Sequence, residues 1–235
     1  MAGDISGADG RVAQHYGTIA VVGGGCYGRY YVRQLRRAAR AGAISWRRLD
    51  VVDRDPACLA TRDADWRNPA GTSPAPRLVA AEWRTYFARA IPDAQPDDAV
   101  VPSPLMPHLM VEWLLDRVAA RWPERTAGLR ALAAPLEVPW QLANGDAPHY
   151  ASFATWTCPV NCIEPARCPH TRGPRDWSMP PTAAAYVAAR RAAGEPLDGP
   201  LVFHCEHRAR LAGSWWDRRP PRPGRDIRTL IGRSG

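Results

Sequence analysis

The sequence predicts an α/β protein built on a doubly wound, mostly parallel sheet. Short apolar runs rich in β-branched residues alternate with segments of helical periodicity over residues 17–142, an alternation typical of parallel strands joined by crossover helices. A glycine-rich turn joins the first apolar run to the first helical segment. After Leu142 the alternation stops, and a small irregular C-terminal region with clustered cysteines begins.

Each element follows from a local pattern. The β-branched run at 18–22 predicts a strand, and the amphipathic segment after the glycines predicts a helix that Gly42 ends. The run at 48–55 predicts a second buried strand, and the turn-forming residues at 63–76 predict a loop. The same reasoning predicts strands at 77–83, 97–103 and 129–139 and helices at 84–91 and 104–122.

The turn after the first strand has the pattern G-x-G-x-x-G, formed by Gly23, Gly25 and Gly28. In a dinucleotide-binding unit the first glycine makes a tight turn, the second lets the backbone approach a pyrophosphate, and the third lets helix and strand pack closely. Asp53, at the end of the second strand, is placed to accept hydrogen bonds from a ribose. The residues expected to contact a nucleotide are Gly23, Gly25, Cys26, Tyr27, Gly28, Asp53 and Arg54.

The stretches IAVVGGGCYG and DVVDRDP resemble the NAD(P)-binding Rossmann domain of the TrkA family of potassium-transport regulators and of many NAD(P)-dependent oxidoreductases. The resemblance covers residues 18–110 and implies a nucleotide site at the glycine turn and Asp53. Its motifs identify a superfamily and not a reaction. A transport role is not implied, because the second half does not look like the regulatory domain of that family.

Three interpretations of the glycine turn stay open. The carboxylate of Asp53 favours NAD over NADP because it repels a 2′-phosphate, although the adjacent Arg54 weakens this preference. The same arrangement serves S-adenosylmethionine in methyltransferases, and VVGGG with VVDRDP resembles the related aminopropyl transferases. The third alternative is a structural turn that binds no ligand.

A cysteine cluster distinguishes the C-terminal region. Cys158, Cys162 and Cys168 lie close together in sequence, and Cys205 falls in a strand predicted at 200–207. Four thiolates suffice for a tetrahedral zinc site or an iron-sulfur cluster. The spacing matches neither that of common zinc ribbons nor that of ferredoxins. The sequence therefore predicts a metal centre without distinguishing zinc from an iron-sulfur cluster. A redox-active disulfide and simple reduced thiols are the alternatives.

His108 is the candidate catalytic residue. It follows the strand predicted at 97–103, at the sheet edge where open α/β proteins bind ligands. A histidine there is suited to donate a proton or contact a substrate. The alternative is a histidine that only begins a helix.

Composition limits the partners and the location. The chain has a net charge of +8 and all 31 basic residues are arginines, but the basic tail lacks interleaved aromatic residues, which argues against nucleic acid. No apolar run reaches the roughly 18 residues of a membrane span, and the N-terminus does not resemble a secretory signal. We therefore expect a cytoplasmic protein without a membrane partner.

The sequence as a whole predicts an NAD(P)-binding oxidoreductase with an iron-sulfur or zinc centre and an unidentified small-molecule or protein redox partner. A non-catalytic redox or nucleotide sensor and an S-adenosylmethionine-type transferase are the alternatives. The predicted segments are a flexible leader (1–16), a Rossmann domain (17–142), a cysteine-rich metal-binding lobe (143–215) containing a helix at 180–196, and an arginine- and proline-rich tail (216–235).

Overall fold

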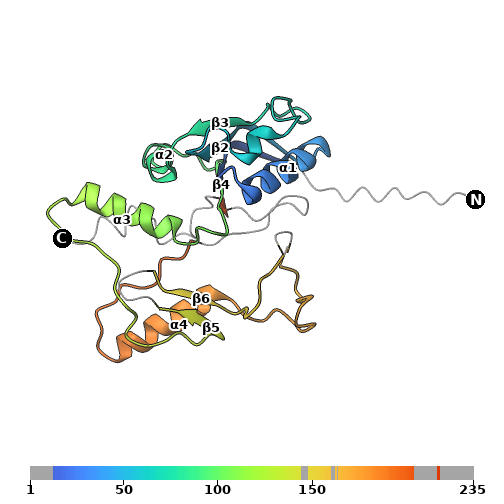
Figure 1. Ribbon diagram of the computed structural model, residues 1–235. Helices are drawn as coiled ribbons and strands as arrows, with labels where there is room; N and C mark the ends of the chain where they lie inside the picture. Colours follow the sequence, from blue (N-terminus) through green and yellow to red (C-terminus); the bar gives the residue numbers. More distant parts are fainter. Residues whose placement is uncertain (1–12, 144–147, 160–161, 163, 204–215, 218–235) are drawn as a thin grey trace, which may run out of the picture.

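The computed structural model describes residues 13–143, 148–159, 162, 164–203 and 216–217. In Figure 1 the larger sheet forms the upper part with α1 and α2, and β5, β6 and α4 form the lower part. The strands are β1 (Gln14–Val22), β2 (Ile44–Asp53), β3 (Arg77–Ala80), β4 (Ala99–Val101), β5 (Trp140–Leu142), β6 (Tyr150–Ser152) and β7 (Trp216–Asp217). The helices are α1 (Cys26–Arg40), the 3-10 helix η1 (Leu59–Arg62), α2 (Trp83–Ala90), α3 (Leu109–Arg121) and α4 (Met179–Ala192).

The larger sheet has the strand order β3-β2-β1-β4-β7. Strands β1 to β4 are parallel, and β7 pairs antiparallel with β4. The prediction of an α/β fold with a mostly parallel sheet is therefore confirmed. From β1 the chain builds the sheet toward β3 on one side and continues with β4 on the other. The carboxyl ends of β1 and β4 thus flank the point where the strand order reverses, which is where open α/β sheets bind ligands.

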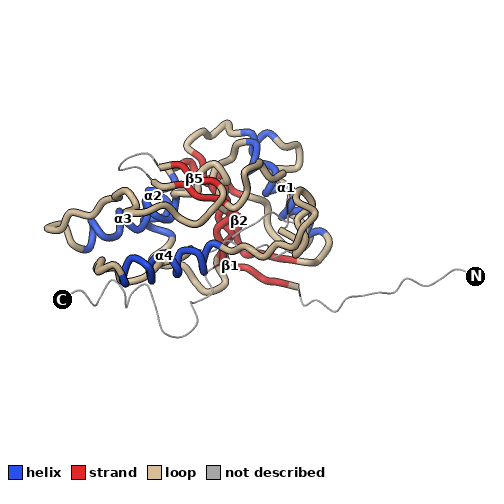
Figure 2. Tube along the Cα trace, turned by 90° about the horizontal axis from the view of Figure 1, so that it is seen from below, coloured by secondary structure: helices blue, strands red, loops and turns tan. Residues whose placement is uncertain are grey.

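Helices cover both faces of this sheet. Val21 packs with Leu35 of α1 in one buried cluster, whereas Val22 packs with Phe87 of α2 and Leu109 of α3 in another. Successive strand residues point to opposite faces, so α1 lies on one face and α2 and α3 lie on the other. Figure 2 shows this arrangement from below, with α1 on one side of the strands and α2 and α3 on the other.

Several predicted elements begin at other residues than expected, and β2, for example, begins at Ile44 and not at 48. β1 begins at Gln14, inside the segment assigned to the leader, because its first residues pair with β2 from Ile44 onward. α3 begins at Leu109 and not at 104, because Pro104 and Pro107 interrupt the preceding chain and the residue before a proline disfavours helix. His108 consequently occupies the N-cap position of α3.

The strand predicted at 129–139 is wrong. The chain is irregular there, where Pro135 and Pro139 limit hydrogen bonding to a sheet. The next two strands, β5 and β6, instead pair antiparallel with each other in a separate sheet. The expected boundary between residues 142 and 143 therefore falls between two paired strands. Of the strand predicted at 200–207, the described residues 200–203 are also irregular.

The C-terminal region has little buried apolar surface. The predicted helix at 180–196 forms as α4, with prolines in its first turn, and the chain leaves it through Gly194 at φ +88°. None of the side chains of α4 is buried. Among the described residues beyond Trp113, the one buried side chain belongs to Cys168, which is 4% exposed. The apolar core of the described molecule therefore lies almost entirely around the larger sheet.

Ion pairs hold the predicted 63–76 loop against α1. The Asp63 carboxylate accepts hydrogen bonds from Arg29 at 2.6 Å and from Arg33 at 2.8 Å. Asp65 forms ion pairs in the same way with Arg36 and Arg40, which lie about one and two helical turns after Arg33 in α1. The arginine-rich face of α1 thus secures the loop.

Within the described residues, no helix combines the length and the apolar character that crossing a bilayer requires.

Candidate functional site

The glycine turn connects β1 to α1 at the carboxyl edge of the sheet. Gly23 has φ +81°, a left-handed conformation that favours glycine, and its N–H donates to the Val52 carbonyl of β2 at 2.8 Å. An added Cβ at Gly28 would lie 1.8 Å from the carbonyl oxygen of Gly23, so the helix passes this turn at the closest possible approach. Both positions therefore require glycine for backbone reasons.

Gly24 and Gly25 have contrasting environments. A Cβ at Gly24 would lie 2.2 Å from the sulfur of Cys58, whereas a Cβ at Gly25 would meet no atom within 4 Å. Cys58 is buried at the N-cap of η1, beneath the turn. The sequence pattern did not single out Gly24, because the motif leaves its position free. The side of the turn at Gly25 is thus the open one.

The first turn of α1 offers unpaired backbone donors. Gly25 is the N-cap and supplies no side-chain cap, and the first turn contains no acidic residue. The first backbone donor paired with the cap is Arg29, whose N–H donates to the Gly25 carbonyl at 2.9 Å. The amides of the residues before it, which include Cys26 and Tyr27, have no partner within the helix because they belong to its first turn. This end of the helix carries the positive end of the helix dipole, which attracts anions.

Asp53 is fixed to the turn by its own carboxylate. One oxygen accepts from the Gly24 N–H at 2.6 Å and the other from the Asp55 N–H at 2.8 Å. Each carboxylate oxygen has a second lone pair, so these contacts leave capacity for a further donor such as a hydroxyl. The neighbouring Arg54 points into solvent with an 82% exposed side chain, and its guanidinium lies 3.5 Å from Glu82. The structure therefore brings Asp53 to the glycine turn and does not bring Arg54 into it.

His108 joins the two parts of the molecule. Its Nδ1 lies 3.2 Å from the hydroxyl of Tyr150 in β6, and the two rings meet edge to face. Its Nε2 lies 3.6 Å from a carboxylate oxygen of Glu112, one turn along α3. If Tyr150 donates to Nδ1, the imidazole proton lies on Nε2 and faces Glu112. The spacing of His108 and Glu112 could have been read from the helix, but the contact with Tyr150 depends on a hairpin that was not predicted.

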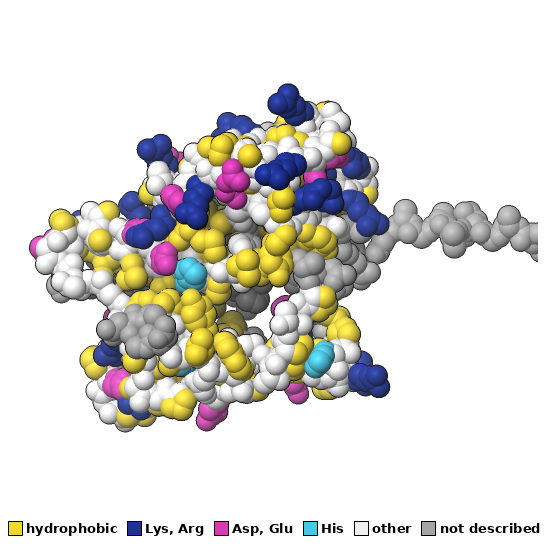
Figure 3. All heavy atoms as spheres, viewed as in Figure 1, with side chains coloured by type: hydrophobic (Ala, Val, Ile, Leu, Met, Phe, Trp, Pro, Cys, Tyr) yellow, Lys and Arg dark blue, Asp and Glu magenta, His cyan; other side chains and the backbone are white. Residues whose placement is uncertain are grey.

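The histidine lies on the same sheet edge as the glycine turn. Val22 directly precedes Gly23 and Leu109 directly follows His108, and these two apolar residues share one buried cluster. On this face of the molecule, hydrophobic side chains gather along the border between the upper and lower parts (Figure 3). A ligand on the glycine turn that extends toward α3 would therefore approach His108 and Tyr150.

Cys168 sits in a tight reverse turn. Its N–H donates to the Gly173 carbonyl at 3.0 Å, and its carbonyl accepts from the Arg172 N–H at 2.8 Å. Arg172 is left-handed at φ +58°, which lets the chain reverse. The backbone N–H of Thr171 is the largest influence on the thiol, and with the Thr171 hydroxyl and the His170 N–H it lowers the pKa of Cys168 despite burial. The turn therefore supports a negatively charged sulfur.

The other described cysteines of this region lie nearby. Partial burial, followed by the proximity of Cys162 and Cys168, raises the pKa of the Cys158 thiol, although the side chain of Trp156 donates a hydrogen bond to it. The indole of Trp156 also stacks on His170 with the ring centroids 4.2 Å apart. In the described part of the chain, no three Cys, His, Asp or Glu side chains are gathered closely enough to hold a metal ion. Cys205 lies outside the described residues.

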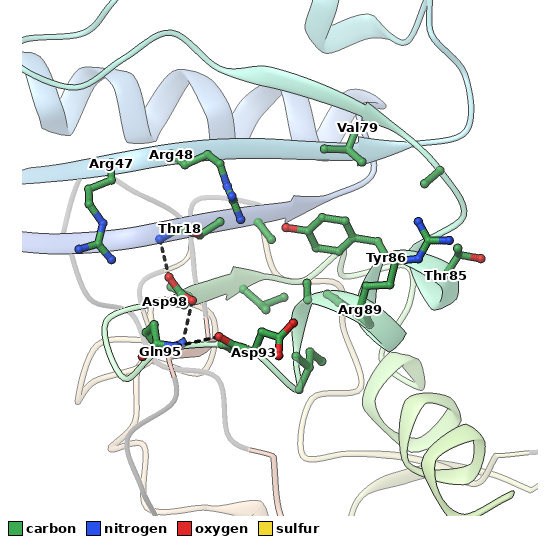
Figure 4. Close-up of a pocket in the computed structure, with 18 residues that line it drawn as sticks. Thr18, Arg47, Arg48, Val79, Thr85, Tyr86, Arg89, Asp93, Gln95 and Asp98 are labelled. Carbon is green, nitrogen blue, oxygen red and sulfur yellow. Dashed lines mark hydrogen bonds between the residues drawn. The ribbon is translucent and has the colours of Figure 1, made fainter. Parts of the chain in front are cut away.

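A cavity of about 600 Å³ lies elsewhere, against the sheet face that carries α2 (Figure 4). Its polar groups are largely paired with one another or with the protein beneath: Asp98 accepts from the Thr18 N–H at 2.6 Å, and Tyr86 donates to the buried Asp50 at 3.0 Å. Burial and then the charge of Asp50 raise the pKa of Tyr86. None of the predicted site residues that the structure describes lines this cavity. It is therefore not the predicted nucleotide site.

Comparison with known families adds one finding. Residues 110–215 match a family described as "Uncharacterized protein, C-terminal domain". The match covers less than half of the chain and begins within α3, so it includes β5, β6, α4 and the cysteines of the C-terminal region. No curated protein and no solved structure matches the chain.

Proposed function

We propose that the protein binds NAD(P) at the glycine turn and acts as an oxidoreductase. The observation that carries the proposal is the open side of the turn at Gly25, next to the uncapped first turn of α1 and the anchored Asp53. A pyrophosphate at Gly25 would accept hydrogen bonds from the free amides, and Asp53 would accept from a ribose hydroxyl. The order β3-β2-β1-β4 supports this assignment, because it matches the first four strands of the order 3-2-1-4-5-6 of a dinucleotide-binding fold.

The geometry favours NAD over NADP. A 2′-phosphate beside Asp53 would face a carboxylate whose two oxygens are held in place by backbone N–H groups. Arg54 would have to leave Glu82 and turn back toward the site to neutralise that phosphate. Because such a rearrangement has an energetic cost and a ribose hydroxyl needs none, NADH should bind more tightly than NADPH.

Tyr150, His108 and Glu112 support an oxidoreductase function. Reduction of a carbonyl by NADH transfers a hydride to carbon and needs one proton for the oxygen, which gives an alcohol and NAD⁺. In the form of His108 that carries a proton on both ring nitrogens, Nδ1–H donates to the Tyr150 oxygen and Nε2–H faces Glu112. Tyr150 can then deliver its own proton to the substrate oxygen and recover one from Nδ1, and the neutral imidazole takes a proton back from solvent. The position of this group on the sheet edge shared with the glycine turn is what supports the assignment.

A valine at Gly25 tests the nucleotide site. Gly25 has φ −68° and open space around its Cβ position, so Gly25→Val should fold normally and place its side chain where the pyrophosphate would lie. We expect NADH affinity, measured by calorimetry, to fall at least about tenfold, or about 1.4 kcal/mol. Gly128→Val is the matched control, because a Cβ there also meets no atom within 4 Å.

The same titrations separate the alternative functions. Unchanged NADH affinity in Gly25→Val would refute the proposed cradle. Tighter binding of S-adenosylmethionine than of either nicotinamide cofactor would favour a transferase. Tight NADH binding without oxidation by any of a broad set of carbonyl compounds and electron acceptors would favour a nucleotide sensor over an enzyme.

A further inference from the structure

The sheet face opposite α1 becomes polar toward the amino ends of its strands. Successive strand residues alternate between the two faces, so Thr18 lies on the same face as Val22, which packs with α2 and α3. Arg48 of β2 pairs with Thr18 in the sheet register. Two residues further along β2, Asp50 pairs with Arg77 of β3. Faces of parallel sheets are usually apolar because helices cover them, so these polar side chains need a separate explanation.

Asp50 is at the centre of this polar part of the face, and it is fully buried. Arg77 donates to both of its carboxylate oxygens, from Nε at 2.8 Å and from Nη2 at 3.2 Å. The hydroxyl of Tyr86 in α2 donates to Oδ2 at 3.0 Å. These contacts already give the buried carboxylate a counter-charge and a partner for each oxygen, as the burial of a charge requires.

Arg48 adds a second guanidinium to a carboxylate that already has one. Its Nε lies 3.3 Å from Oδ2 of Asp50, and its half-exposed side chain makes no other hydrogen bond or ion pair with the described residues. The hydroxyl of Thr18, on the neighbouring strand, also has no hydrogen-bond partner in the described part of the chain. Because Arg48 and Arg77 share one carboxylate, the group carries an excess of one positive charge. It therefore has free donors for a further acceptor.

These free donors border the cavity of about 600 Å³ beside α2. Figure 4 shows the Arg48 side chain reaching from β2 between Thr18 and Tyr86. The carboxylate of Asp98 also lines the cavity, but it accepts from the N–H of Thr18 at 2.6 Å and from that of Gln95 at 2.8 Å. Asp98 is thus held by the backbone, and among the described residues Arg48 pairs with the buried carboxylate of Asp50 alone.

Much of the remaining wall is apolar. It is formed by the sheet, by α2 and by the residue that follows α2, and includes Ala20, Val79, Phe87, Ile91 and Val100. A cavity of this volume accommodates a small organic molecule. An apolar body would displace water from these walls, which is favourable, whereas a purely polar ion would leave them wet. The cavity therefore matches a molecule with one anionic group and a compact apolar part.

We propose that this cavity binds a small organic monocarboxylate with a compact apolar body. The carboxylate accepts hydrogen bonds from the terminal nitrogens of Arg48 and from the hydroxyl of Thr18, and the apolar body lies against the sheet and α2. One negative charge balances the one excess positive charge. None of the described residues assigned to the nucleotide lines the cavity, so this site does not depend on nucleotide binding.

A benzoate titration of the full-length protein, followed by saturation-transfer difference NMR, tests the site. We expect a dissociation constant of about 1 mM or lower. Benzamide has the same shape without the charge, and acetate has the charge without the ring. Each should bind at least about tenfold more weakly than benzoate, because each lacks one half of the recognised chemistry.

Two substitutions locate the bound carboxylate. Arg48→Met keeps the aliphatic stem and removes the guanidinium, so benzoate affinity should fall at least about tenfold. Thr18→Val removes only the hydroxyl and should lower the affinity about threefold to tenfold. Arg37→Met is the matched control, because Arg37 is an exposed arginine of α1, on the other face of the sheet, and it should leave the affinity unchanged. Urea unfolding shows that each variant is folded, since Asp50 keeps its other two partners.

Four results would overturn the proposal. They are no saturation transfer to benzoate at about 10 mM, equal affinity for benzoate and benzamide, tighter binding of inorganic phosphate than of benzoate, and a folded Arg48→Met protein with unaltered benzoate affinity. An NADH titration of the unaltered chain is a separate measurement. Its failure would refute the nucleotide site and leave benzoate binding in this cavity untouched, and failure of benzoate binding would leave the nucleotide site untouched.

Discussion

The region around the larger sheet and the region after α3 are stabilised in different ways. In the first, long parallel strands and three helices bury two apolar clusters on opposite sheet faces. The second consists of a hairpin with three residues per strand, a helix without buried side chains and irregular segments. Its one buried side chain among the described residues is that of Cys168. The first region can position a rigid ligand site, whereas the second depends on specific polar and sulfur contacts. The proposed nucleotide site accordingly lies in the first region.

Adding one methyl group in each region should show the difference most strongly. Gly28→Ala places a Cβ 1.8 Å from a backbone oxygen at the start of α1, so the helix must move away from β1. Overpacking of this severity costs about 3 kcal/mol or more. Gly173→Ala, beside the Cys168 turn, brings its Cβ no closer than 3.6 Å to Thr171 and should change the free energy of unfolding by less than about 0.5 kcal/mol.

Urea unfolding of the two variants followed by circular dichroism measures this contrast. A Gly28→Ala protein as stable as the unaltered chain would show that the close approach of helix and strand is not a constraint. A large loss in Gly173→Ala would show that the C-terminal region is packed more tightly than its exposure indicates.

The contact between the two regions should matter for turnover more than for stability. Tyr150→Phe keeps the edge-to-face ring contact with His108 but removes the hydroxyl. If Tyr150 is the proton donor, NADH-dependent reduction of a carbonyl substrate should fall by about 100-fold or more. NADH affinity should stay unchanged, because the hydroxyl is not part of the glycine turn.

Steady-state kinetics on the best substrate from a carbonyl panel gives this result. His108→Gln should lower the rate of carbonyl reduction about as much as Tyr150→Phe does. The double variant should be no slower than either single variant, since the effects of residues that act as a unit are not additive. Full activity in Tyr150→Phe would assign His108 and Tyr150 a purely structural role at the border.

The sequence predicted the sheet region far better than the C-terminal region, and the reason is physical. The strand at 18–22, the helix ended by Gly42 and the strand ending at Asp53 are specified by local apolar patterning and by backbone needs of glycine. The β5–β6 hairpin has three residues per strand and no alternation long enough to read. Because the hairpin was not predicted, the contact between Tyr150 and His108 was not predicted either.

The candidate sites show the same limit. The motif identified Gly23, Gly25 and Gly28, because each has a backbone role at a fixed spacing. It did not identify the close packing of Gly24 against the Cys58 side chain, since that contact joins residues that are distant in sequence. For the cysteines, the spacing indicated a metal, whereas the side chains of the described residues gather no three ligands for one.

The smallest expected effect is the acid sensitivity of the loop on α1. Burial raises the pKa of Asp63, but hydrogen bonds and charges from Arg33 and Arg29 outweigh it and hold the pKa below its ordinary 3.8. The ionised form is therefore favoured by folding, so its stabilisation is complete above the unfolded pKa and is lost as the pH falls through the lower folded pKa. Because both guanidiniums are partly exposed, Asp63→Asn should cost only about 1 kcal/mol at pH 7.

Urea unfolding at pH 7 and at pH 3 checks both the size and the sign of this effect. The difference between Asp63→Asn and the unaltered chain should shrink at pH 3, where the carboxylate begins to be protonated. Glu195→Gln is the comparison in the other region: the hydrogen bond from Arg190 lowers the pKa of Glu195 next to α4, yet its loss should leave global unfolding unchanged, because α4 contributes no buried side chain. Equal losses from the two substitutions would mean that the two regions unfold as one cooperative unit.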